Sequence, residues 1–205
     1  HTRSSAASDV YKRQVANSAI DIASRALVLI GAEPITSFDS SSTEALVASN
    51  MYEDTVRATL ATARWRFASE QAVLNQLTDK PTGRFDIAHQ LPSDLLVLHG
   101  VTISDRLIEY TVYGDKVFSD STTADTLIAD YTFRAEEVNF PSYFALALQY
   151  SLASIFATSI ARDDRLMQLM ETKANMLMAK ARNLDAQQQT TRRLSTSRFI
   201  TNRRS

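Results

Sequence analysis

Apolar positions near the start of the chain recur every three or four residues. They are Ala16, Ile20, Ala23, Leu27 and Ile30. This spacing predicts an amphipathic helix over residues 17–30. Gly31 is typical of a left-handed C-terminal cap, and Pro34 prevents the helix from continuing.

A second helical repeat follows a polar run. The run, residues 39–43, reads Asp-Ser-Ser-Ser-Thr and offers several side-chain oxygens for an N-cap. The apolar positions of the repeat are Tyr52, Val56, Leu60 and Ala63. They predict a long helix that ends near Trp65, with Trp65 in the core or at a subunit interface.

Between Trp65 and Arg134 the hydrophobic period changes to two, which indicates strands. The alternating segments are residues 85–91, 108–112, 117–118 and 127–133. Gly114-Asp115 favours a tight turn between the second and third segments. Pro92-Ser93-Asp94 predicts a short helical turn through Leu98. This region is therefore expected to form a small antiparallel sheet with a turn of helix embedded in it.

Helical patterning returns after Pro141. Residues 140–161 are the one membrane-span candidate, but six hydroxyl and amide side chains interrupt them, which favours a helix buried in protein. Asp163-Asp164 suits the start of a further helix that ends near Gln187, because negative charge favours a helix N-terminus. Its apolar stripe comprises Leu166, Met170, Leu177, Ala181 and Leu184.

These patterns predict an α+β fold that is mainly α. We expect a helical bundle of about four long helices, with a small antiparallel β-sheet inserted between the N-terminal and C-terminal helix pairs. Residues 15–187 form the single domain, and residues 188–205 form a basic tail. Residues 1–14 are set aside, because SSAASDVYKRQ resembles one reading frame of a transposase-type sequencing adapter. That interpretation places the native start upstream; the alternative is a genuine N-terminal arm.

The amino-acid composition excludes several kinds of functional site. The chain has no cysteine, so it has no disulfide, thiolate metal ligand or Cys nucleophile. It has four glycines and none of the motifs GxGxxG, GxxxxGK[ST] or GxSxG, which argues against the common nucleotide-binding folds and the α/β-hydrolases.

The remaining candidates for catalysis are histidines and paired acids. His89 is expected to face a sheet and His99 to end a turn, without the convergent ligands that zinc needs. The acidic pairs are Glu53-Asp54, Glu136-Glu137 and Asp163-Asp164. Neighbours on a helix diverge, so the pairs are interpreted as helix caps and solvated faces. We therefore predict no enzyme activity, no metal and no cofactor.

The basic tail is the main candidate for binding a partner. Its proposed contact residues are Arg192, Arg193, Arg198, Phe199, Ile200, Arg203 and Arg204. The body from Val15 to Gln189 carries a net charge of −8, against −1 for the whole chain. The tail could bind nucleic-acid phosphates or an acidic protein, or only aid solubility; the two apolar residues among the arginines favour docking onto protein.

Four methionines late in the chain leave two interpretations open. Met167, Met170, Met176 and Met178 could form an adaptable binding face or could pack in the core. More apolar surface than one helix face needs would favour helices of another subunit as neighbours.

Several short motifs, in order, resemble the tail tubular protein A family of phage head–tail adaptors. The motifs are LVLIGAEPITSFDSSSTEA with Gly31, Pro34, Ile35 and Ser37, then Tyr52, Arg57, the ARWRFA segment with Trp65 and Phe67, and QLPSDLL with Leu91, Pro92 and Asp94. The resemblance covers about residues 19–184. Each motif is weak alone; their order and spacing carry the resemblance.

The resemblance implies a structural virion protein made in the host cytoplasm and located at the head–tail junction. Such adaptors form a ring, generally a dodecamer, that joins the portal protein to the tail nozzle protein and leaves a channel for DNA in transit. No membrane is involved. The basic tail would then dock on the portal. Two other functions stay open: a DNA-binding accessory protein that uses the arginine tail, and a virion-associated saccharide or cell-wall hydrolase.

Overall fold

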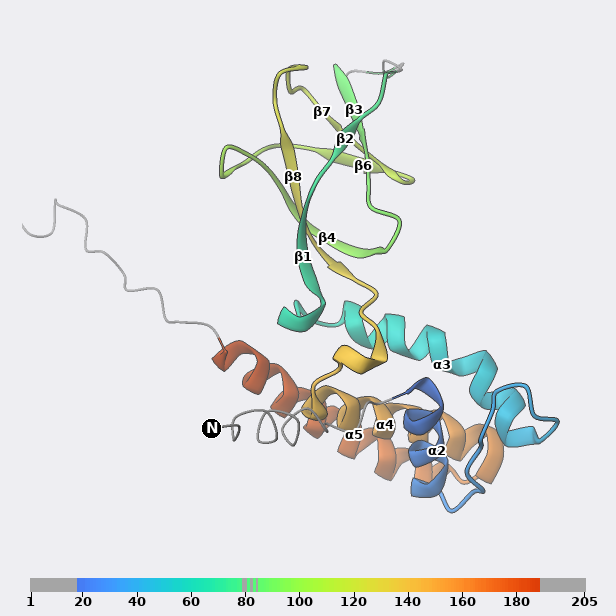
Figure 1. The fold of residues 1–205 in the computed structure, drawn as a ribbon. Helices are drawn as coiled ribbons and strands as arrows, with labels where there is room; N and C mark the ends of the chain where they lie inside the picture. The colour runs from blue at the N-terminus through green and yellow to red at the C-terminus, as the bar shows by residue number, and fades with distance from the viewer. Residues whose placement is uncertain (1–17, 79–80, 82, 84, 189–205) are drawn as a thin grey trace, which may run out of the picture.

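The computed structural model describes residues 18–78, 81, 83 and 85–188. The α+β class is confirmed, because the described residues form four α-helices and two small antiparallel sheets. We use the name helical body for residues 18–68 and 134–188, and β lobe for residues 69–133. The β lobe stands on the helical body, with α3 at its base (Figure 1).

The first two helices begin at serine caps. The helices are α2 (Ala19–Leu29) and α3 (Thr43–Ala61). Ser18 and Asp21 form a reciprocal capping box on α2, and the Ser42 hydroxyl accepts a hydrogen bond from the backbone of Ala45. Gly31, at a φ of 78°, closes α2 as predicted. The second helix is confirmed, but it ends at Ala61 rather than near Trp65.

The C-terminal helices are α4 (Ser142–Phe156), continued by a π-helical turn (Ala157–Ala161), and α5 (Asp164–Gln187). The Asp163 carboxylate caps α5, as predicted. Residues 142–161 are long and apolar enough to cross a membrane, and half of this segment is buried inside the protein. Helix α4 lies between α2, α3 and α5, and this packing accounts for its apolar composition.

Aromatic and aliphatic side chains of all four helices form the main core. Trp65, just after α3, is fully buried against Phe144 of α4, with ring centroids 5.0 Å apart. Its indole N–H donates to the backbone oxygen of Thr59 at 3.3 Å. Trp65 therefore lies in the core of the chain, one of the two positions that its sequence context predicts.

The β lobe contains two four-stranded sheets, where the sequence predicts one. The first has the order β1 (Ser69–Val73), β8 (Leu127–Phe133), β4 (Leu95–Ile103), β5 (Arg106–Leu107). The second has the order β2 (Asn75–Gln76), β3 (Ile87–Gln90), β7 (Lys116–Ser119), β6 (Thr111–Tyr113). The predicted turn at Gly114 is confirmed: it joins β6 to β7 at a φ of 62°.

The predicted helical turn from Pro92 to Leu98 is wrong. Only a turn at Ser93 and Asp94 interrupts the extended chain, and β4 begins at Leu95. The segment is extended because it pairs with β8. Packing against cross-strand neighbours stabilises a strand more than local propensity does, so the pairing overrides the local helical signal. His99 consequently lies within a strand and does not end a turn.

Candidate functional site: the junction, a helical groove and a β-lobe pocket

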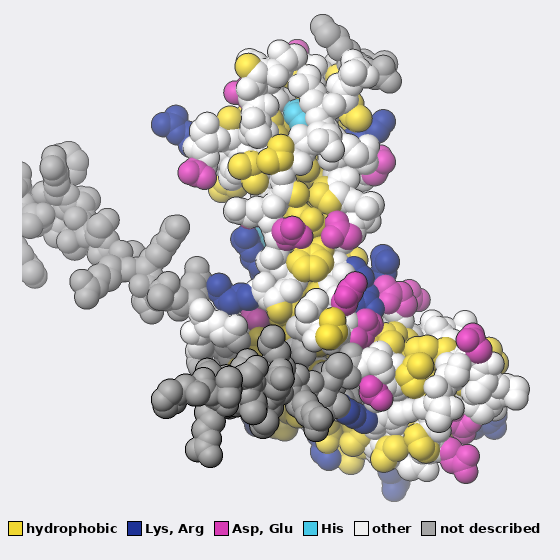
Figure 2. All heavy atoms as spheres, in the orientation of Figure 1, with side chains coloured by type: hydrophobic (Ala, Val, Ile, Leu, Met, Phe, Trp, Pro, Cys, Tyr) yellow, Lys and Arg dark blue, Asp and Glu magenta, His cyan; other side chains and the backbone are white. Residues whose placement is uncertain are grey.

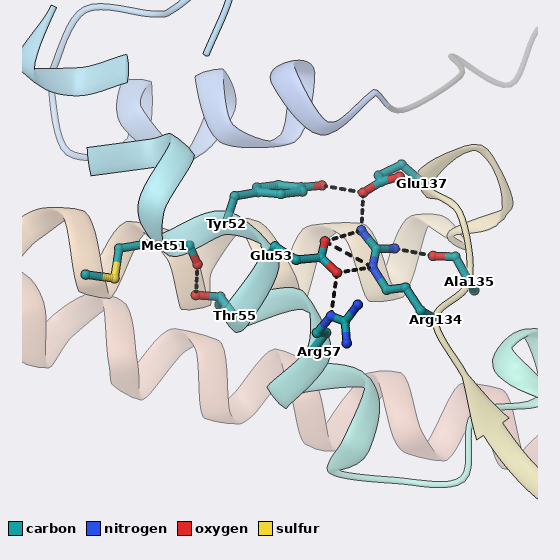
Figure 3. A network of polar contacts seen from close by, with 8 residues as sticks. All are labelled: Met51, Tyr52, Glu53, Thr55, Arg57, Arg134, Ala135 and Glu137. Atoms are coloured by element: carbon teal, nitrogen blue, oxygen red, sulfur yellow. Dashed lines mark hydrogen bonds and ion pairs between the residues drawn. The ribbon is translucent and has the colours of Figure 1, made fainter. Parts of the chain in front are cut away.

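The β lobe is joined to the helical body through a partly buried arginine (Figure 3). Arg134 directly follows β8, and its guanidinium contacts one carboxylate on α3 and one on the connector to α4. The N–O distances are 2.9 Å to Glu53 and 2.6 Å to Glu137. The same guanidinium donates to the backbone oxygen of Ala135. One cation thus fixes three segments relative to one another.

Two further side chains complete this junction. Arg57, one turn along α3, contacts Glu53 at 2.7 Å, and the Tyr52 hydroxyl donates to Glu137 at 3.3 Å. Burial, together with the negative charge of Glu137, raises the pKa of Tyr52 and keeps the phenol neutral. Two arginines and two carboxylates balance in charge. The arrangement suits a structural joint, because both carboxylates are paired with Arg134.

Sequence reasoning missed this junction. It examined acidic residues that are neighbours in the chain and interpreted all of them as caps or solvated faces. That interpretation holds for Asp163, which caps α5, but not for Glu137, whose side chain is only 20% exposed. The carboxylates that meet belong to different pairs, 84 positions apart. The one available signal was Arg134, an isolated basic residue at the end of a strand.

The junction predicts how stability depends on pH. Hydrogen bonding from Arg134 lowers the pKa of Glu53 below its ordinary value of 4.5. Because the folded pKa lies below the unfolded one, Glu53 stabilises the fold above pH 4.5, and this contribution is lost as the pH falls through the folded pKa. We expect the free energy of unfolding to fall more steeply below pH 4.5 in the native chain than in Glu53→Gln, measured by urea titration. Parallel curves would contradict the prediction, and Glu171→Gln on exposed α5 is the control.

A second polar cluster ties the other connector to the end of α5. The buried carboxylate of Asp185 accepts hydrogen bonds from the backbone N–H of Arg66 at 2.9 Å and from the Tyr143 hydroxyl at 2.8 Å. The Arg66 side chain donates to the backbone oxygen of Asp185 at 3.1 Å. Burial, with the bond to Asp185, raises the pKa of Tyr143 to about 12. Both chain segments that enter the β lobe are therefore anchored by polar contacts to the helical body. Acidic and basic side chains gather where the lobe meets the body (Figure 2).

A shallow groove of about 440 Å³ lies on the helical body between α3, α4 and α5. Its lining is mostly small or apolar, with one acid and one base: Met51, Asp54, Thr55, Ala58, Thr59, Thr62, Ser151, Ile155, Ala174, Asn175, Met178 and Arg182. The helices also expose large apolar side chains at Val28, Leu46, Met51, Leu146, Leu169, Met176 and Leu184.

The sequence left open whether the methionines of α5 pack in the core or form an exposed binding face, and the structure shows both positions. Met170 and Met178 are buried on the inner face of α5, and Met176 is 51% exposed on its outer face. Most of the predicted stripe of α5 is confirmed: Met170 and Ala181 are buried, and Leu166 and Leu177 pack partly buried against the core. Leu184 is the exception, because it is 47% exposed and Asp185 is buried in its place.

A second pocket, of about 650 Å³, lies in the β lobe. It is lined by three large apolar or aromatic side chains, two acids and one threonine: Phe85, Ile108, Tyr110, Glu109, Asp120 and Thr111. The three segments that form it are the residues before β3, the connection from β5 to β6, and the residue after β7. It therefore lies at one end of the second sheet.

The histidines are structural in the described part of the chain. His89 is buried on β3, which confirms that it faces a sheet, and its Nδ1 has no hydrogen-bond partner there. Burial lowers the pKa of His89 and favours the neutral ring. His99 Nε2 lies 2.8 Å from Thr132 Oγ1 on β8. No three potential ligands converge on a metal site among the described residues. The seven tail residues predicted to bind a partner lie outside the described residues.

Comparison of the chain with models of known protein families finds no family that matches. Comparison with curated proteins likewise finds no match.

Proposed function

We propose that this chain is a non-catalytic virion protein, the subunit of a ring that joins the portal of a tailed phage to the downstream tail nozzle. In this proposal twelve copies surround the channel through which DNA leaves the head. The protein would be made in the host cytoplasm and incorporated at the head–tail junction without a cofactor.

The observation that carries the proposal is the groove on the helical body between α3, α4 and α5. Its lining includes Met51 on α3, an apolar side chain that is exposed. A neighbouring copy that packs into such a groove would remove this apolar surface from water. The order of helices, strands and helices agrees with the motifs that resemble head–tail adaptors.

In the proposed ring, the helical body is the bundle that contacts neighbouring copies. The β lobe, inserted in the chain between α3 and α4, projects from that bundle. The junction at Arg134 and the cluster at Asp185 would keep the lobe in a fixed orientation, as a ring with a channel requires. The saturated carboxylates of the junction support this structural role over hydrolysis of saccharides.

The test is to mix the full chain with the portal protein encoded nearby on the same DNA. We expect a ring to form on the portal and not in its absence, measured by negative-stain class averages and by the mass of the complex.

A chain that lacks residues 192–205 should lose portal binding. Ala58→Arg, which places a charge in the groove, should still bind the portal but form incomplete rings, and Asn183→Arg, on exposed α5, should assemble normally. Salt-sensitive DNA binding without portal association would overturn the proposal in favour of a DNA-binding accessory protein.

A further inference from the structure

The charge of the chain is divided unevenly between its parts. Residues 69–133 contain ten acidic and four basic residues, a net charge of −6. The helical body contains twelve acidic and ten basic residues, a net charge of −2. The last 16 residues contain five arginines and no acid. The β lobe is therefore the part of the molecule that most attracts the tail.

Within the β lobe, the 650 Å³ pocket combines negative charge with apolar surface. The pairing of β6 with β7 ends at Thr111 opposite Phe118. Glu109 and Asp120 lie just beyond this ladder, and both line the pocket. Neither carboxylate forms an ion pair with another described residue. A cation in the pocket would be attracted by both carboxylates.

The remaining lining suits a side chain that is both charged and apolar in part. Tyr110 provides aromatic surface, on which a guanidinium can stack. Beside the pocket, β6 is an edge strand with Val112 and Tyr113 exposed. An extended segment that alternates arginine with apolar residues would complement both the pocket and this edge. The tail contains one such segment, Arg198-Phe199-Ile200, followed by Arg203 and Arg204.

The tail starts at the base of the β lobe of its own copy. Asp185, three residues before the end of the described chain, bonds to Arg66 at the entry to the β lobe, so α5 ends at the base of that lobe. From Gln188 to Phe199 is eleven residues. Fully extended, they span about 36 Å.

We propose that residues 198–204 dock in the pocket formed by Glu109, Asp120, Phe85 and Tyr110 of the same copy, with an arginine between the two carboxylates. This contact goes beyond the ring-subunit function and does not require it. It holds the tail on the β lobe of the free subunit, so any other partner of the tail must displace it.

The absence of cysteine makes a direct test possible in the full chain. Thr111→Cys in the pocket is combined with Thr201→Cys in the tail, and the control pair is Asn75→Cys with Thr201→Cys. Asn75 is exposed on β2, the opposite edge of the same sheet. Formation of the intramolecular disulfide is followed by mass in a glutathione buffer at micromolar protein, with unfolding midpoints measured for every variant.

We expect the pocket pair to form its disulfide at least about tenfold faster than the control pair, because docking raises the effective concentration above that of a free tether. Glu109→Gln with Asp120→Asn in the pocket pair, or 500 mM salt, should reduce the rate to that of the control. Equal rates for the two pairs, no response to removal of the carboxylates, or disulfides that form only between copies would each overturn the proposal. No portal protein is present, so the outcome is independent of the ring-subunit function.

Discussion

Replacing Arg134 by methionine is expected to lower the free energy of unfolding by about 2–3 kcal/mol. Removing one partner of a buried ion pair typically costs about 3–5 kcal/mol, because the other charge is left buried and unpaired. The Arg134 side chain is 17% exposed and that of Glu137 is 20% exposed, but Glu53 is 47% exposed and can still be hydrated. The expected loss therefore lies below the fully buried case. Urea unfolding at pH 7, followed by tryptophan fluorescence, measures it.

Arg57→Met is the matched control for this substitution. Arg57 contacts the same carboxylate of Glu53 but is 55% exposed. Exposed ion pairs one helical turn apart contribute about 0.3–0.5 kcal/mol. If Arg134→Met and Arg57→Met lower the free energy of unfolding equally, Arg134 only balances the charge of Glu53. It then does not join the β lobe to the helical body.

The helices were predictable because each carries its own signals. The periodic apolar positions of α2 coincide with a Ser18 cap and the Gly31 stop, so local and tertiary requirements agree. The β lobe was less predictable. Pro92-Ser93-Asp94 resembles a helix start, and only the pairing of β4 with β8, about 30 residues further along the chain, determines that the segment is extended.

The polar contacts that anchor the lobe could not be predicted from spacing. Arg134 and Glu53 are 81 positions apart, and Asp185 and Arg66 are 119 apart. The stripe on α5 shows the same limit. Residues three and four positions after Ala181, which are Leu184 and Asp185, lie equally well on the same helix face. Only the polarity of the side chain favoured Leu184 over Asp185 as the buried residue. The structure buries the aspartate because Arg66 and Tyr143 satisfy its oxygens.

Asp185→Ala is therefore expected to destabilise the chain by about 2–4 kcal/mol. Hydrogen bonds to a charged group contribute about 1.5–3 kcal/mol each, and the substitution leaves the Arg66 N–H and the Tyr143 hydroxyl without their acceptor. Asp185→Asn keeps one acceptor oxygen and should lose about half as much. Glu171→Ala, on an exposed face of α5, should stay within about 0.5 kcal/mol of the native chain.

A second measurement separates the anchoring role of Asp185 from general stability. Amide hydrogen exchange should increase around Arg66 and at the start of β1 in Asp185→Ala, before the strands at the far end of the lobe respond. This order is expected because Asp185 bonds directly to the segment that leads into β1. Uniform acceleration throughout the chain would contradict a local anchor and would mean that Asp185 contributes only to global stability.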